Sequence, residues 1–261
     1  TRKMSLLLKP ISYQKRFLSW FLMITLLVVL IIHQLPARWV IRIVADQTFC
    51  QVHLKDISGT IWQGSASLGI AQLAPGSTAC SRSKTITERL NWDLKCSLSD
   101  WSCFLRVEHF AFEKPLMISW ADGRWKLSNN ILKISAHLLE NLGSPWNTIK
   151  PVGQLTASWS DLELGQGGLG SLRIVMHEMS SPISPVVPLG SYEIMMNMAM
   201  LDQWDLKTLM GPLVLAGQGK IHDRQLSFVG QAFALNQNTE SLASLLSLIG
   251  VQQGDIYRLQ F

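Results

Sequence analysis

The sequence carries little charge, and beyond its first 16 residues it has no segment in which basic side chains are concentrated. Charged residues make up 16% of the 261 residues, and the formal net charge is +5. Five of the 23 basic residues lie at the start of the chain, so the other 18 balance the 18 acidic residues. Proteins that bind nucleic acid carry a basic patch or stripe, so this balance argues against a nucleic-acid partner. The five basic residues are Arg2, Lys3, Lys9, Lys15 and Arg16.

Catalytic motifs are missing in the local context that their chemistry requires. We find no Gly-x-Ser-x-Gly, His-Glu-x-x-His or Ser-x-x-Lys arrangement placed as in hydrolases. Residues 165–170 match the Gly-x-Gly-x-x-Gly spacing of dinucleotide-binding loops, but a strand-like segment follows where such a loop needs a helix. Asp161 and Glu163 fit a solvated strand face better than a carboxylate pair. The sequence therefore predicts no catalytic residue and no cofactor.

The sequence does contain an apolar run at residues 17–32. Counted from Phe17 to Leu35, it has the roughly 17 to 25 residues that a membrane-spanning helix needs, and it holds no Asp, Glu, Lys or Arg. Each Leu, Ile, Val or Phe near its middle favours insertion by about 0.3–0.6 kcal/mol. We expect an uncleaved anchor. A cleaved signal peptide is the alternative, but its apolar core is usually about 7 to 15 residues and ends at small residues.

The basic residues before the run predict the orientation of the chain, because cytoplasmic flanks are enriched in Lys and Arg. We therefore expect a cytoplasmic stub at residues 1–16, a transmembrane helix at residues 17–35 and a periplasmic domain at residues 36–261. The protein would then lie in the cell inner membrane and cross it once. The exported part is long enough for one large β domain or two small ones.

Four cysteines, all beyond the apolar run, suit a compartment in which disulfides form. Four cysteines allow three pairings. We favour Cys96 with Cys103, because residues 97–102 can turn between two short strands, which leaves Cys50 with Cys80. A zinc site is the rival interpretation, but the usual closely spaced Cys or His pairs are missing, so we expect no metal ligand.

Alternating apolar and polar residues beyond the run predict β-strands. Residues 90–96 are the clearest example, because apolar and polar side chains alternate there as in a half-buried antiparallel strand. Asp122 followed by Gly123 is a strong hairpin-turn signal. Further strands are expected at residues 155–164, 172–179, 192–200, 213–222, 225–235 and 256–261.

Two short helices are expected among the strands, because apolar residues recur there at spacings of three and four. The first covers residues 131–142 and ends at Gly143. The second covers residues 242–249, with Asn238 or Thr239 as its N-cap and Gly250 as its end. The predicted fold is mainly β: an N-terminal transmembrane helix followed by an antiparallel, twisted sheet with two short helices.

Residues 180–190 form a proline-rich stretch that can be neither a helix nor a central strand. A linker between two domains is one interpretation. The apolar residues within the stretch favour an ordered crossover held against the sheet instead. We therefore prefer one continuous sheet to two domains.

Several segments along the chain are similar to the characteristic segments of a known protein family. The segment at residues 181–192 is the most recognisable, and its sequence is SPISPVVPLGSY. The others are LPARWV at residues 35–40, ISGTIWQGSA at 57–66, GPL at 211–213, GQG at 217–219 and LLSLIG at 245–250 followed by Gly254 and Asp255. In this order and spacing they resemble the type II secretion system protein N family.

The resemblance implies an accessory inner-membrane component of the general secretion pathway, with a periplasmic β domain and no catalytic residues. Its partners would be other type II secretion subunits, and it would support the export of folded periplasmic proteins through protein-protein contacts. The alternative is a membrane-tethered carrier of lipid or another hydrophobic ligand, because a long twisted sheet can offer an apolar trough. Residues 194–200, which include four methionines, fit such a trough, although Met-rich packing in a core is commoner.

Overall fold

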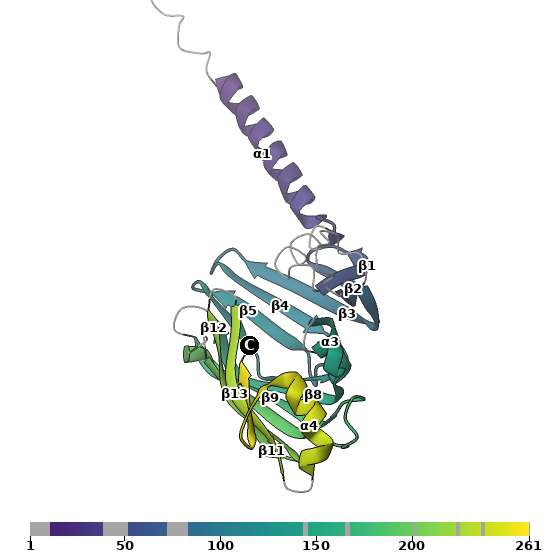
Figure 1. Cartoon of the computed structure of the whole chain (residues 1–261). Coiled ribbons are helices and arrows are strands. Elements are labelled where there is room, and N and C mark those ends of the chain that lie inside the picture. The colour runs from purple at the N-terminus through teal and green to yellow at the C-terminus, as the bar shows by residue number, and fades with distance from the viewer. Residues whose placement is uncertain are drawn as a thin grey trace, which may run out of the picture.

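The computed structural model describes residues 11–38, 52–71, 83–142, 146–164, 168–200, 203–222, 225–235 and 238–260. Within these residues the chain is mainly β, with one large antiparallel sheet, an N-terminal helix and a few short helices (Figure 1). The N-terminal helix α1 spans Ile11–His33. Among the described residues, no helix is long and apolar enough to cross a membrane.

Fifteen strands in the described residues belong to one sheet, in the order β1-β2-β3-β4-β5-β6-β8-β9-β10-β11-β12-β13-β15-β14, with β7 paired to β8 beside this path. The preference for one continuous sheet is thus confirmed. The strands are β1 (Val52–Gly59), β2 (Gln63–Ala71), β3 (Ser83–Ser97), β4 (Ser102–Glu108), β5 (Leu116–Ala121), β6 (Arg124–Leu127), β7 (Asn130–Ser135), β8 (Val152–Leu164), β9 (Leu169–Ser180), β10 (Gly190–Asn197), β11 (Gln203–Met210), β12 (Leu213–His222), β13 (Gln225–Ala234), β14 (Val251–Gln253) and β15 (Ile256–Gln260).

The short helices are η1 (Ala136–Leu142), α3 (Trp146–Ile149), η2 (Met198–Met200) and α4 (Thr239–Ile249). The predicted helix at residues 242–249 is confirmed by α4, although the side chain of Asn238 makes no capping hydrogen bond. The predicted helix at residues 131–142 is wrong in its first half, where β7 pairs with β8 over six residues. Residues 131–135 form a strand and not a helix because they can pair with the backbone of β8. The β-branched Ile131 and Ile134 also fit a pleated surface.

One face of the sheet is apolar because the strands are paired in matching register. Leu94, Leu105, Ile118, Leu127 and Leu162 are direct partners across β3, β4, β5, β6 and β8. Residues directly opposite each other on neighbouring strands point to the same face. This row therefore defines what we call the inner face of the sheet.

The helices cover only part of this inner face. Leu242 and Leu246 of α4 are at most 1% exposed and pack with buried residues of β12, β13 and β15. Ala136 of η1 packs on Leu155 of β8. A register shift between Ser160 and Glu163 keeps Leu162 on the same face as Leu155. Figure 1 shows α3 and α4 on the same side of the curved sheet.

The proline-rich stretch is an ordered crossover between β9 and β10, as predicted. Ser181, Ser184 and Leu189 are buried. The Leu189 amide donates to the Met179 carbonyl at 2.7 Å, and the Leu213 amide donates to the Leu189 carbonyl at 3.0 Å. These backbone bonds join the crossover to two strands, so the prolines lie at the end of the sheet without interrupting it.

Gly219 in β12 occupies a position that has no room for a side chain. It lies between Trp204 of β11 and Phe228 of β13, which are its direct partners on either side. The two rings stack with centroids 5.1 Å apart and an interplanar angle of 11°. A Cβ at Gly219 would lie 1.8 Å from Trp204 Cε2, which is far inside contact distance. The missing side chain thus makes room for an aromatic pair on the inner face.

Gly219→Ala should lower the free energy of unfolding by about 1–3 kcal/mol, because the new methyl group displaces the Trp204 ring. Urea unfolding of the full chain in detergent, followed by circular dichroism, measures this loss. The neighbouring exposed substitution Lys220→Ala should stay within about 0.5 kcal/mol of the parent. The cost of Gly219→Ala should shrink in a Trp204→Ala background, and an unchanged cost there would contradict the proposed clash.

Candidate functional site

Backbone and side-chain hydrogen bonds tie the end of α1 to the turn between β1 and β2. The Trp62 indole N–H donates to the Ile32 carbonyl at 2.9 Å. The Ile61 amide donates to the Leu35 carbonyl at 3.0 Å. The last carbonyls of a helix lack the usual amide partner of the next turn. Trp62 thus adds a donor to the Ile32 carbonyl, which also accepts from the Leu35 amide at 3.4 Å. We call this contact the joint; it consists of Ile32, Leu35, Pro36, Ala37, Gly59, Thr60, Ile61 and Trp62.

The joint fixes the side from which α1 reaches the sheet. Pro36 and Thr60 form an antiparallel bridge, and the Ala37 amide donates to the Gly59 carbonyl at 3.2 Å. Ala37 is 1% exposed, so the connection is packed against the sheet. Because the chain runs antiparallel to the end of β1, α1 lies beyond the end of the sheet at which β1 finishes. We call this the α1 end of the sheet.

The inner face over β3, β4 and β5 is apolar but not closed. Leu94, Leu105 and Ile118 are half-buried there, whereas the helices of the described residues pack on β2, β8, β9, β12, β13 and β15. Trp120 and Trp125 add two rings with centroids 6.4 Å apart. Half-buried apolar side chains on one continuous face can contact an acyl chain or an apolar segment of a partner.

A polar cleft of about 370 Å³ lies on β2, β3 and β4 beside the joint. Gln63 Nε2 donates to Asp93 Oδ2 at 3.2 Å, while Asp93 Oδ1 is buried without a hydrogen-bond partner. Arg106 and Glu108 form an ion pair at 2.5 Å in the lining. The remaining residues that line the cleft are Gly64, Asn91 and Trp92. Charges of both signs in an open cleft suit a polar protein surface better than a small apolar ligand.

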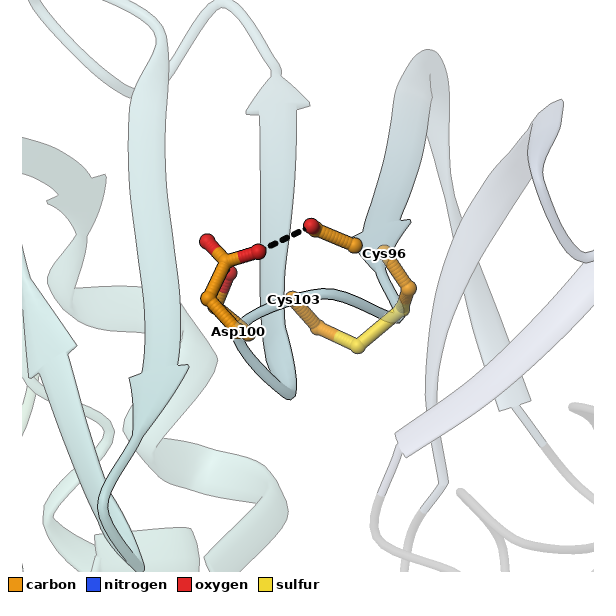
Figure 2. Close-up of a disulfide and its surroundings, with 5 residues drawn as sticks. Cys96, Asp100 and Cys103 are labelled. Carbon is orange, nitrogen blue, oxygen red and sulfur yellow. Dashed lines mark hydrogen bonds between the residues drawn. A yellow bond between two sulfur atoms is a disulfide. The ribbon is translucent and has the colours of Figure 1, made fainter.

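The disulfide between Cys96 and Cys103 closes the turn from β3 to β4, and it is the pairing that the sequence favoured. Its sulfur atoms are 2.03 Å apart, and the two residues are direct partners across the strands (Figure 2). Asp100 accepts hydrogen bonds from the hydroxyls of Ser97, Ser99 and Ser102. The Ser97 bond contributes most to lowering the pKa of Asp100, so this carboxylate stays ionised. Cys50 and Cys80 lie outside the described residues.

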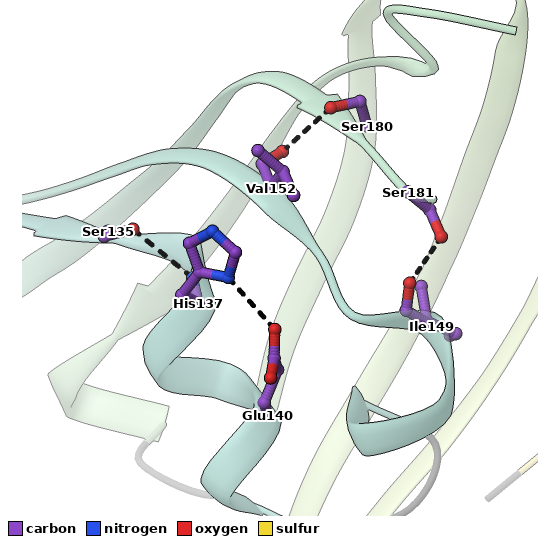
Figure 3. A network of polar contacts seen from close by, with 7 residues as sticks. All are labelled: Ser135, His137, Glu140, Ile149, Val152, Ser180 and Ser181. Carbon is purple, nitrogen blue, oxygen red and sulfur yellow. Dashed lines mark hydrogen bonds and ion pairs between the residues drawn. The ribbon is translucent and has the colours of Figure 1, made fainter. Parts of the chain in front are cut away.

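Ser135, His137 and Glu140 have the residue types of a catalytic triad but not its geometry. His137 Nδ1 lies 3.0 Å from Glu140 Oε1, whereas the Ser135 hydroxyl accepts from the backbone amide of His137 at 3.4 Å (Figure 3). A triad needs the serine hydroxyl bonded to the histidine ring. Figure 3 also shows the hydroxyls of Ser180 and Ser181 bonded to main-chain carbonyls. This network ties η1 and α3 to the sheet.

Glu193 lies at the centre of an ion group on the opposite face of the sheet. Lys207 Nζ and Arg173 Nε each lie 2.5 Å from one of its oxygens, and the Glu193 side chain is 5% exposed. Lys207 contributes most to holding the pKa of Glu193 below its usual value, followed by Arg173. The three residues come from β9, β10 and β11, so the group links neighbouring strands across the outer face.

The other candidate residues from the sequence do not form a site. Residues 168–170 follow β8 and open β9, so the glycine-rich spacing leads into a strand and not a helix. Asp161 has a φ of 46° at the register shift, and Glu163 pairs with Lys126 at 2.7 Å. Within the described residues, no group of three or more His, Cys, Asp or Glu could hold a metal ion.

The two residues predicted to bound the anchor both lie in or next to α1. Phe17 lies inside α1, which begins at Ile11, and Leu35 lies beyond its end in the joint. Trp62 was the residue that sequence reasoning missed. Its indole bonds to a carbonyl 30 residues earlier, and no local sequence pattern signals that contact.

Comparison with known proteins yields one match. A family model described as "Type II secretion system (T2SS), protein N" matches residues 51–260. No curated protein and no solved structure matches the chain. The matched family is a structural component of secretion in the cell envelope and is not known for enzymatic activity. Because the match covers β1 to β15 and most of the chain, the protein belongs to the type II secretion system protein N family.

Proposed function

We propose that this protein is a single-pass inner-membrane component of the type II secretion system, with its N-terminus in the cytoplasm and its sheet in the periplasm. It supports export of folded proteins through contacts with other secretion subunits and catalyses no reaction. The observation that carries the proposal is the joint, which attaches a family-matched sheet directly to an apolar helix.

The anchor that we propose is the whole apolar run from Phe17 to Leu35, which continues past the end of α1, and the side chains of the run support this role. The large apolar residues from Phe17 to Ile32 are 45% to 77% exposed, so the sheet does not bury them. Exposed apolar surface of this extent marks a surface that another phase or partner covers. The basic residues before Phe17 favour a cytoplasmic N-terminus.

In the described part of the chain, β14 offers the sheet edge for subunit contacts, because Pro36 and Ala37 already bond to the end of the β1 edge. β1 lies at one end of the strand order and β14 at the other. Val251 in β14 is 71% exposed. A cleft of about 550 Å³ runs beside β14 and is lined by Leu248, Ile249 and Arg258 among others. An edge strand next to a cleft lined by both apolar and polar side chains suits an extended segment of another subunit, which would add a strand and insert alternate side chains.

The anchor is tested by Leu27→Arg in the middle of the apolar run. Arginine near a helix centre costs about 2.5–3.5 kcal/mol on insertion scales, so the inner-membrane fraction of the protein should fall. Leu248→Arg on the exposed face of α4 is the matched control and should fractionate as the parent does. Unchanged inner-membrane fractionation of Leu27→Arg would refute the anchor.

Subunit contact is tested by photo-crosslinking in secreting cells. A photoreactive amino acid in place of Val251 should yield adducts with other type II secretion subunits, and deletion of the protein should reduce export of folded proteins. The same amino acid in place of Val187, which is similarly exposed but lies in a crossover, controls for random collision. Recovery of no secretion subunit, together with unchanged export after deletion, would overturn the proposal.

A second function, lipid carriage, is favoured by the half-buried apolar side chains on the inner face over β3, β4 and β5. Residues 36–261 exported without detergent should then carry phospholipid in native mass spectrometry. Ile118→Asp introduces a charge on the inner face and should abolish this lipid. The adjacent Ser119→Asp lies on the outer face and should retain it. A parent protein free of lipid would count against carriage.

A further inference from the structure

The turn between β3 and β4 presents large apolar side chains to solvent. Leu98 is 83% exposed and Trp101 is 76% exposed, which is more than any other large apolar residue described outside α1. The turn is part of the loop that the Cys96–Cys103 disulfide closes. We call residues 97–102 the tip. Exposed apolar groups of this size cost free energy in water, so their position calls for an apolar surface that covers them.

The tip is built to hold those side chains in place. The disulfide joins its two ends, and the hydroxyls of Ser97, Ser99 and Ser102 bond to Asp100 within it. The polar groups of the turn thus satisfy one another. A loop that is already ordered loses little conformational freedom when it docks, so more of its burial free energy remains for binding.

The strand order places the tip at the same end of the sheet as α1. Neighbouring strands are antiparallel, so the turns after β1, β3 and β5 all lie at the α1 end. The β3–β4 hairpin also extends beyond the level at which β2 begins. Gln63 pairs with Asp93, and Ser97 lies four residues further along β3. At about 3.3 Å per residue, the tip projects about 13 Å past this level.

The direction of α1 makes this projection point toward the anchor's surroundings. The chain enters the sheet from beyond the α1 end, and α1 and the long strands β3 and β4 slope the same way in the view of Figure 1. The polar layer on each side of a bilayer is roughly 5–8 Å thick, from the difference between its full and hydrocarbon thickness. A tip that extends about 13 Å past the start of β2, on the same side of the sheet as α1, can therefore approach and enter that layer.

The neighbouring turns support contact with a membrane surface. Trp125 beside the β5–β6 turn is 50% exposed, and Leu169 beside the β8–β9 turn is 55% exposed. Tryptophan is enriched at the boundary between headgroups and acyl chains. The tip carries the carboxylate of Asp100 and no basic residue. This composition suits the boundary of a zwitterionic bilayer better than its hydrocarbon centre or an anionic surface.

We propose that the tip is a second membrane contact, in which Leu98 and Trp101 insert into the outer leaflet boundary of the bilayer that α1 crosses. The inference rests on the proposed anchor. Two contacts, α1 and the tip, fix the tilt of the sheet relative to the membrane plane, whereas one helix alone can still tilt in the bilayer and carry the sheet with it. The open inner face and the edge strands would then be held at a set height and direction.

Site-specific photo-crosslinking to lipid tests the proposal. The full chain is reconstituted in vesicles of phosphatidylcholine and phosphatidylethanolamine, with a diazirine-bearing amino acid in place of Leu98, Val187 or Leu27 in separate samples. Val187 is the matched control, because it is 70% exposed and lies at the opposite end of the sheet from α1. Mass spectrometry of the tip peptide measures the lipid adduct and reports whether the disulfide is intact.

Lipid adducts at position 98 should exceed those at position 187 by about tenfold or more, which corresponds to a preference of about 1.4 kcal/mol. Adducts at position 27 with equal, low yields at positions 98 and 187 would overturn the tip contact and leave the anchor standing. An absence of adducts at position 27 would instead refute the anchor on which the inference rests. Adducts at position 98 with protein in place of lipid would also overturn the tip contact.

Discussion

The continuous antiparallel hydrogen-bond ladder is the constraint on which the rest of the structure depends. Because every strand from β1 to β15 pairs antiparallel with a neighbour, alternate turns must lie at the same end of the sheet. The same pairing brings Leu94, Leu105, Ile118 and their partners into one row and so produces a single apolar face. The joint, the tip and the inner face are thus consequences of one ladder.

The short helices cover one part of the apolar face and leave another part accessible. Leu242 and Leu246 of α4 close a core with residues of β12, β13 and β15. The face over β3, β4 and β5 remains half-open beside the joint. The part of the sheet nearest the joint is thus the part whose inner face the helices leave accessible.

Local patterns predicted much of the sheet but failed where two patterns overlap. The alternation in β3 and the turn at Asp122 and Gly123 were read correctly, since both depend on neighbouring residues alone; both turn residues have positive φ, as the hairpin signal requires. Residues 131–135 carry apolar spacing that also suits a helix, and only pairing with β8 made them a strand. Trp62 and Gly219 could not be interpreted from the sequence, because their partners Ile32 and Trp204 are brought to them by folding.

The sequence by itself determined the mainly β character, the apolar run within α1 and the pairing of Cys96 with Cys103, because each depends on residues that are close together along the chain. Only the tertiary structure decided that Trp62 binds the end of α1, that the tip lies at the same end of the sheet, and that α4 covers one part of the inner face while another stays open. These features depend on strand register and direction, which accumulate over the whole ladder and have no signature in any single segment.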